Sequence, residues 1–268
     1  MKTNKILSLF CIVLLFSIAT SGCTHSLQNK DIIYQYSTIN SLLAGVYDGQ
    51  TLYSTIRKQG DFGLGTFNSL DGEMIGLDGE FFQIKADGIV NRVDDSMKTP
   101  FVMVKFFKPD KSLQLDQALD YKQLAYYLDT LLPTKNIFYA VRIDGMFSYI
   151  KARSVPAQHK PYPPLVEAAK KQVIFEFHDI EGTIVGFRSP SYIEGINVPG
   201  YHLHFISKDR KSGGHLLDCM LQNVHVEIDD THELYMVLPH SGDFYNVNLT
   251  PNTRKELDKV EKEDVRKK

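Results

Sequence analysis

The chain has 268 residues and an ordinary globular composition, with 43% hydrophobic and 23% charged residues. Its length allows one large or two small domains, and a body of roughly 240 residues can bury a substantial core. The formal net charge is −2, and losing Lys2 and Lys5 with the leader described next would give −2 − 2 = −4. This balance lacks the basic footprint of a nucleic-acid-binding protein, so we expect no nucleic-acid partner.

The first 22 residues have the pattern of an export signal. Lys2 and Lys5 form a basic region, and the apolar stretch that follows is too short to predict a transmembrane span. The stretch ends in small residues before Cys23, as in a bacterial lipobox, where the cysteine is lipidated and becomes the new N-terminus. We therefore predict a lipoprotein-type signal peptide over 1–22, export, and membrane contact only through a lipid anchor at Cys23. Plain cleavage, giving a secreted or periplasmic protein, is the alternative, because Thr20 stands where leucine is typical.

The cysteines predict a mature domain without disulfides. If Cys23 is acylated, Cys219 is the one cysteine that remains, and we expect it to be a small buried apolar residue. Residues 23–30 form a short polar tether. The rest divides into an N-terminal β-rich half over 31–150 and a C-terminal metal-binding half over 151–268.

Strand-type residues dominate the first half. Between residues 60 and 89 the sequence is glycine-rich, and Asp71-Gly72 and Asp78-Gly79 are hairpin signals. The spacing of these glycines does not match the dinucleotide-binding fingerprint. We predict further strands over 31–36 and 100–107 and a short helix over 37–44.

The strongest helix signal begins near Asp120. Gln123 follows three residues later as a capping-box partner, and Pro133 ends the helix. Residues 136–150 read mostly as strand, with a turn at Asp144-Gly145. We predict a second helix over 163–171 and strands over 173–177, 183–188, 200–207, 214–220, 224–228 and 234–238. The fold class is therefore α+β, with strand-dominated mixed sheets in two packed halves and a few helices.

A weak internal similarity suggests that the two halves are duplicated. Gly72-Glu-Met-Ile-Gly-Leu in the first half is similar to Gly182-Thr-Ile-Val-Gly-Phe in the second.

Three histidines form the sharpest local signal. His202 and His204 alternate along a predicted strand, so they share one face of it. A polar turn ending in Gly213-Gly214 precedes His215, and a hairpin would return this residue beside the first two. Three neutral imidazoles with an open fourth position are typical of a catalytic zinc site. The other histidines show no comparable grouping.

Several motifs resemble those of the α-acetolactate decarboxylase family. Residues 200–206 with 213–215 are similar to the family's metal-binding segment, and 60–68 with 70–75 are similar to its N-terminal active-site stretch. Residues 34–47 and the segment from 141 to 156 add further similarity. The resemblance spans about residues 34 to 262, and its motifs occur in the family's order.

The resemblance implies a zinc enzyme that converts 2-acetolactate, a 2-hydroxy-3-keto acid, to acetoin and carbon dioxide. Its zinc ligands would be His202, His204 and His215. Zinc can chelate the ketone and hydroxyl oxygens and stabilise the charge left by departing carbon dioxide, and no organic cofactor is required.

The resemblance also implies roles for residues around the metal. Glu73 and Arg153 match the family's acid–base and anion-handling residues, and Thr66 matches its active-site threonine. A C-terminal glutamate also reaches the site in the family, and Glu261 is the match in this sequence. Two other glutamates of the same run stay open as alternatives, Glu256 and Glu263.

Two other functions fit part of the pattern. One is a different zinc enzyme on a cupin-like barrel, against which the helix beginning near Asp120 counts. The other is an exported, non-enzymatic lipoprotein that binds metal or sugar, which would not need Glu73, Thr66 and Arg153 in their motifs. The sequence leaves open whether the chain forms a homodimer.

Overall fold

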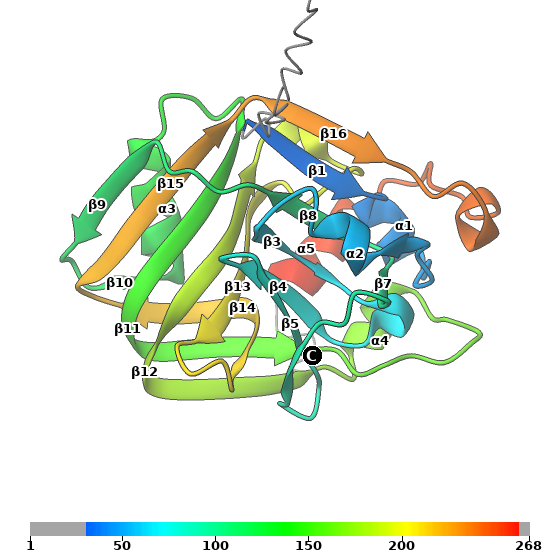
Figure 1. Cartoon of the computed structure of the whole chain (residues 1–268), viewed down its shortest axis with the longest axis horizontal. Helices are drawn as coiled ribbons and strands as arrows, with labels where there is room; N and C mark the ends of the chain where they lie inside the picture. Colours follow the sequence, from blue (N-terminus) through cyan, green and yellow to red (C-terminus); the bar gives the residue numbers. More distant parts are fainter. Residues whose placement is uncertain (1–30, 263–268) are drawn as a thin grey trace, which may run out of the picture.

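The structure is a computed structural model that describes residues 31–262 (Figure 1). The predicted signal peptide over 1–22, the tether over 23–30 and Glu263 lie outside the described residues. Strands far outweigh helices, which confirms the strand-dominated α+β class. Across residues 31–262, none of the helices has the length and apolar character needed to cross a membrane.

The first sheet has seven strands and is antiparallel except at one edge, where β1 and β16 run parallel. Its central strands are buried along their whole length, as expected for a sheet covered on both faces. In spatial order the strands are β16 (Glu233–Val237), β1 (Ile32–Tyr36), β8 (Val102–Lys105), β3 (Phe62–Thr66), β4 (Glu73–Leu77), β5 (Glu80–Ile84) and β6 (Val90–Arg92).

The second sheet also has seven strands, all antiparallel, and it closes partly on itself. Closure occurs because β14 pairs with both β13 and β11, so the four strands β11 to β14 form a ring. In spatial order the strands are β10 (Leu119–Asp120), β14 (Gly213–Leu221), β13 (Gly200–Ser207), β12 (Val173–Ser189), β11 (Phe138–Ser154), β15 (Val224–Thr231) and β9 (Lys111–Leu115).

Two apolar cores follow from the alternation of side chains along these strands. Leu203 and Phe205 of β13 point into the ring, where Leu124 and Leu128 cover them from helix α3 (Tyr121–Leu131). On the other face, Val185 of β12 belongs to the layer that packs against the first sheet. The functional site described below lies between the two sheets.

The remaining elements are short. A two-stranded ribbon joins β2 (Thr51–Leu52) to β7 (Lys98–Thr99). The helices are α1 (Ile39–Leu43), α2 (Tyr53–Ile56), α4 (Leu165–Ala169), α5 (Arg254–Lys262) and the 3-10 turns η1 (Asn68–Leu70), η2 (Ser191–Ile193) and η3 (Gly242–Tyr245).

Local signals predicted some elements well. The side chain of Asp120 accepts a hydrogen bond from the backbone of Gln123, and the Gln123 side chain accepts one from the backbone of Asp120. This capping box begins α3, as predicted. Asp78 and Gly79 form a two-residue hairpin turn between β4 and β5, both with positive φ.

The turn predicted at Asp144-Gly145 is wrong. Strand β11 runs without a break from Phe138 to Ser154. Gly145 is needed there for close packing, since a Cβ at this position would lie 2.7 Å from the Cγ1 of Val224. The strands predicted over 173–177 and 183–188 are likewise one strand, β12, which pairs with β11 along most of its length.

The sheets divide the chain differently from the predicted halves. The first takes its strands from residues 32–105 and 233–237, and the second takes its strands from 111–231. The expected boundary between residues 150 and 151 falls inside β11. The division into two halves, and a duplication behind it, stay predictions.

A buried ion pair connects the two sheets. The Lys105 ammonium on β8 donates hydrogen bonds to Asp229 and Thr231 on β15, and its side chain is fully buried. The second carboxylate oxygen of Asp229 accepts a hydrogen bond from the backbone N–H of Lys108. Each buried charge is therefore stabilised by its partner in place of water.

We predict that Asp229→Asn lowers the free energy of unfolding by about 3–5 kcal/mol, because the Lys105 charge stays buried without its counter-charge. Urea denaturation measures the change. Glu80→Gln is the control, since it removes one partner of the exposed Arg92–Glu80 pair and should leave stability nearly unchanged. Equal losses in the two variants would contradict the prediction.

Candidate active site

Strand register brings the three predicted histidines together. His202 and His204 lie on the same face of β13, and His204 is the direct partner of His215 across the β13–β14 pair. Partners in an antiparallel pair point to the same face. The three ring centroids lie 5.1–5.3 Å apart, and one nitrogen from each ring lies within 4.8 Å of the others. Among the described residues, no other group of three or more histidine, cysteine or acidic side chains converges in this way.

Backbone hydrogen bonds fix the orientation of two of these rings. His204 Nδ1 donates to the carbonyl oxygen of Met74 at 2.9 Å, and His215 Nε2 donates to that of Glu261 at 3.0 Å. The opposite nitrogens, His204 Nε2 and His215 Nδ1, are buried without a hydrogen-bond partner, as is His202 Nδ1. A nitrogen that accepts no hydrogen bond keeps its lone pair available to bind a metal ion. The three histidines therefore fit a bound cation.

The electrostatics keep the imidazoles neutral. Burial, reinforced by the nearby Arg153 charge, lowers the pKa of His202 to about 3. Burial also lowers the pKa values of His204 and His215 well below the usual range, with neighbouring cationic groups adding to the shift. A neutral imidazole offers a lone pair, so the three side chains could hold a metal ion.

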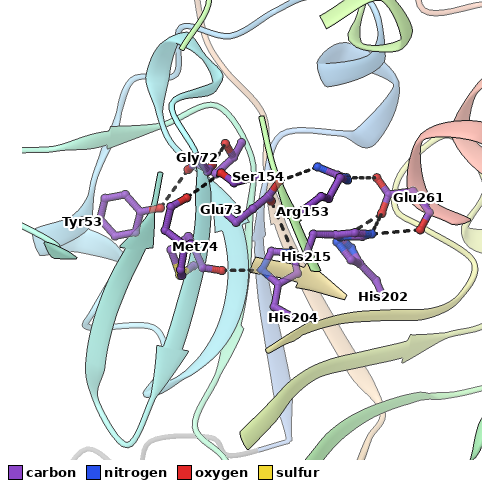
Figure 2. Close-up of polar contacts among 12 residues, drawn as sticks. Tyr53, Gly72, Glu73, Met74, Arg153, Ser154, His202, His204, His215 and Glu261 are labelled. Carbon is purple, nitrogen blue, oxygen red and sulfur yellow. Dashed lines mark hydrogen bonds and ion pairs between the residues drawn. The ribbon is translucent and has the colours of Figure 1, made fainter. Parts of the chain in front are cut away.

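Glu73 and Arg153 form a buried ion pair beside the histidines (Figure 2). Arg153 Nη1 donates to Glu73 Oε1 at 2.6 Å, and the other carboxylate oxygen lies 3.7 Å from His204 Nε2. Register explains the position of Arg153, which is the direct partner of His215 across the β11–β14 pair. Burial raises the pKa of Glu73 to about 7, although Arg153 opposes the shift.

The backbone conformation and close packing at Gly72, in the Leu-Asp-Gly-Glu motif, explain why glycine stands at this position. Gly72 has a φ of +90°, and a Cβ on it would lie 2.3 Å from the carbonyl oxygen of Ile84 on β5. Thr66, the predicted active-site threonine, is the register partner of Glu73, and its hydroxyl donates to the Gly72 carbonyl at 2.7 Å. Thr66 therefore lies in the site and also secures the backbone that leads to Glu73.

The C-terminal helix α5 brings Glu261 to the histidines. Glu261 Oε2 lies 3.4 Å from His202 Nε2, and Glu261 Oε1 lies 4.0 Å from Arg153 Nη2. Glu261 shares the buried face of α5 with Leu257 and Val260. Of the two alternatives left open by the sequence, Glu256 is exposed and Glu263 lies outside the described residues.

The polar part of the lining of a small cavity of about 30 Å³ consists of Thr66, Glu73, Arg153, His202, His204 and Glu261. The rest of the lining is mostly apolar, and the sequence analysis did not identify it. Its residues come from α1, η1, α4 and connecting segments, so no local motif marks them as neighbours. They are Ile39, Leu42, Leu70, Phe101, Val155 and Leu165.

Two neutral imidazoles, two carboxyl groups and a guanidinium converge on this cavity, and His215 completes the histidine cluster beside it. Convergent polar groups in a largely apolar lining are typical of a site for a small polar molecule. The sequence matches the family model for alpha-acetolactate decarboxylase over residues 33–251. The chain therefore belongs to the alpha-acetolactate decarboxylase family, and it is a carbon–carbon lyase of the decarboxylase type.

Individual relatives agree with this assignment. The alpha-acetolactate decarboxylase of Methanosarcina mazei is 50% identical over 233 residues, which cover 87% of this chain and 81% of that protein. That of Methylococcus capsulatus is 47% identical over 88% of this chain and 92% of its own length. The crystal structure of alpha-acetolactate decarboxylase from Bacillus subtilis strain 168 has a TM-score of 0.85 at 45% identity, covering 87% of this chain and 100% of that one.

We predict that the purified protein holds about one divalent metal ion per chain and that His204→Ala loses it, because a site with three imidazoles cannot easily spare one. Metal analysis of the dialysed protein measures this. His225→Ala is the matched control, since that histidine is exposed and lies outside the cluster. A His204→Ala protein that keeps its metal would show that these histidines do not hold the ion.

Proposed function

We propose that this protein is a zinc-dependent decarboxylase that converts 2-acetolactate to acetoin and carbon dioxide, with zinc held by His202, His204 and His215. The observation that carries the proposal is the placement of the buried Glu73–Arg153 pair beside the histidine cluster, at a small cavity that the pair lines together with His202 and His204. Zinc bound there would supply a Lewis acid for the ketone and hydroxyl oxygens of the substrate.

Arg153 would bind the substrate carboxylate. Its Nη1 is engaged by Glu73, but its Nε is buried without a hydrogen-bond partner, which leaves a donor for an incoming anion. A planar guanidinium suits a carboxylate, and in a desolvated cavity the charge interaction is strong. Arg153 would therefore orient the substrate so that the bond to its carboxylate is the one that breaks.

Glu73 would move the proton. Its carboxyl group lies at the cavity wall, in contact with Arg153 and within 3.7 Å of His204 Nε2. A carboxyl group in this position can accept the proton of the substrate hydroxyl and later return a proton to carbon. Thr66 and Glu261, which also line the cavity, would complete the polar wall around the reacting atoms.

The two alternatives drawn from the sequence have less support. A non-enzymatic metal- or sugar-binding lipoprotein gives no reason to bury Glu73 and Arg153 beside the histidines. A cupin-like zinc enzyme would share the histidines, but the chain is similar to acetolactate decarboxylases over most of its length.

The test is acetoin release from racemic 2-acetolactate by the zinc-loaded protein. Glu73→Gln and Arg153→Met should each lower the rate by about 10²-fold or more while zinc content stays near that of the wild type, because these groups act on the substrate and not on the ion. Zinc analysis and kinetics on the same preparations separate binding from turnover.

Glu256→Gln is the matched control, since Glu256 is an exposed glutamate of the same helix as Glu261. It should keep both zinc and rate. A Glu73→Gln enzyme with full zinc and near-normal turnover would show that another carboxyl group moves the proton. A zinc-loaded wild type that releases no acetoin would refute the proposed function.

We further propose that the protein is exported and anchored by lipid on Cys23. Cells grown with labelled palmitate should label the protein, and Cys23→Ser should abolish the label because it removes the acceptor thiol. Cys219→Ser, at a buried cysteine of the folded domain, should keep the label. An unlabelled wild type with a mature N-terminus elsewhere would instead indicate plain signal cleavage.

A further inference from the structure

Strand β11 ends beside the active site with a buried serine. Ser154 directly follows Arg153 and is the last residue of the strand (Figure 2). Pairing with β14 reaches Arg153, opposite His215, while pairing with β12 continues to Ser154. The end of a strand has fewer backbone partners than its centre, so its position depends more on side-chain contacts.

A hydrogen bond ties this strand end to the first sheet. Ser154 is fully buried, and its hydroxyl donates to the carbonyl oxygen of Ile84 on β5 at 2.8 Å. A buried hydroxyl is costly unless it is hydrogen-bonded, which favours keeping this contact. Ile84 is the direct register partner of Glu73 across the β4–β5 pair. The bond therefore joins the residue after Arg153 to the residue opposite Glu73.

Ile84 lies where the two sheets meet. A Cβ on Gly213 of β14 would lie 3.2 Å from the Cγ1 of Ile84, and a Cβ on Gly72 would lie 2.3 Å from its carbonyl oxygen. The carbonyl that accepts the Ser154 hydrogen bond is thus in contact with the backbone immediately before Glu73. A change at Ser154 would reach Glu73 through this one carbonyl group.

The ion pair between Arg153 and Glu73 does not by itself fix the separation of the strands. Both side chains have several rotatable bonds, so the contact of 2.6 Å between them could follow a small displacement of either backbone. The oxygen of Ser154 is separated from the backbone by a single rotatable bond and has no such freedom. The serine therefore sets the distance between β11 and β5, and with it the points from which the guanidinium and the carboxyl group extend.

From this geometry we propose that Ser154 is a positioning residue, which sets the places of Arg153 and Glu73 relative to the reacting atoms by holding β11 against β5. The inference rests on the proposed function, in which Arg153 binds the substrate carboxylate and Glu73 moves the proton. Proton transfer needs close contact, and a misplacement of about 1 Å can cost about 10²-fold in rate. Charge attraction to a carboxylate falls off more gradually with distance, so the loss should appear in kcat and not in KM.

The experiment measures kcat, KM and zinc content for Ser154 variants of the zinc-loaded enzyme. Ser154→Ala should lower kcat by about 10-fold, as expected for a displacement smaller than 1 Å, with KM within about twofold of the wild type and zinc content unchanged. Ser154→Thr keeps the hydroxyl and should restore most of kcat. Should Ser154→Ala fail to fold, Ser154→Cys replaces it, because a thiol is similar in shape but is a weak donor.

Ser41→Ala is the matched control. Ser41 is also a fully buried serine whose hydroxyl donates to a backbone carbonyl, that of Thr38 at 2.7 Å, but this bond lies within the first turn of α1. The variant loses the same kind of hydrogen bond without releasing β11 from β5. Its kcat should stay within about twofold of the wild type.

A double variant tests whether Ser154 acts through Glu73. In Glu73→Gln the group that moves the proton is already lost, so adding Ser154→Ala should lower kcat further by less than about twofold. A general weakening of the fold would instead lower kcat by the same factor in both backgrounds.

A kcat within about twofold of the wild type in the Ser154→Ala or Ser154→Cys protein that folds would overturn the inference. An equal loss in Ser41→Ala, a folded Ser154→Thr as slow as Ser154→Ala, or a full further loss in the Glu73→Gln background would also overturn it. These results leave the proposed function intact, because they require an active wild type. A wild type that releases no acetoin would instead overturn the proposed function, and this inference with it.

Discussion

The pairing of β11, β14 and β13 is the constraint on which the site depends. Register in these two strand pairs sets Arg153 opposite His215 and His215 opposite His204, so three functional side chains form one row on one face. Because strand side chains repeat every two residues, a shift of one position in either pair would turn a member of the row to the opposite face. Closure of the ring fixes this register, since β14 must satisfy two partner strands at once.

Burial gives the row its chemical character. The same face packs against the first sheet, which contributes Glu73 and the Met74 carbonyl, while α5 covers it with Glu261. Away from water, imidazoles stay neutral, a carboxyl group keeps its proton to higher pH, and a guanidinium needs an anionic partner. The strand pairs β11–β14 and β3–β4 hold Arg153 and Glu73 in these buried positions.

The sequence predicted those features whose cause is local. Alternation along 200–206 placed His202 and His204 on one face, and the capping box located the start of α3 at Asp120. The turn predicted at Asp144-Gly145 failed because a glycine has two uses that look alike in sequence. There it permits the close approach of Val224 from a neighbouring strand, and no turn forms.

By itself the sequence determined the family, the class of fold and the residue types that could meet at a metal site, because the order of motifs and the periodicity of side chains can be read along one chain. Tertiary structure alone decided that Glu261 and not Glu256 faces the histidines, and that six apolar side chains close the cavity. Glu73 and Arg153 are 80 residues apart, and His215 and Glu261 are 46 apart. Contacts over such separations depend on how the sheets pair and pack, which no local pattern specifies.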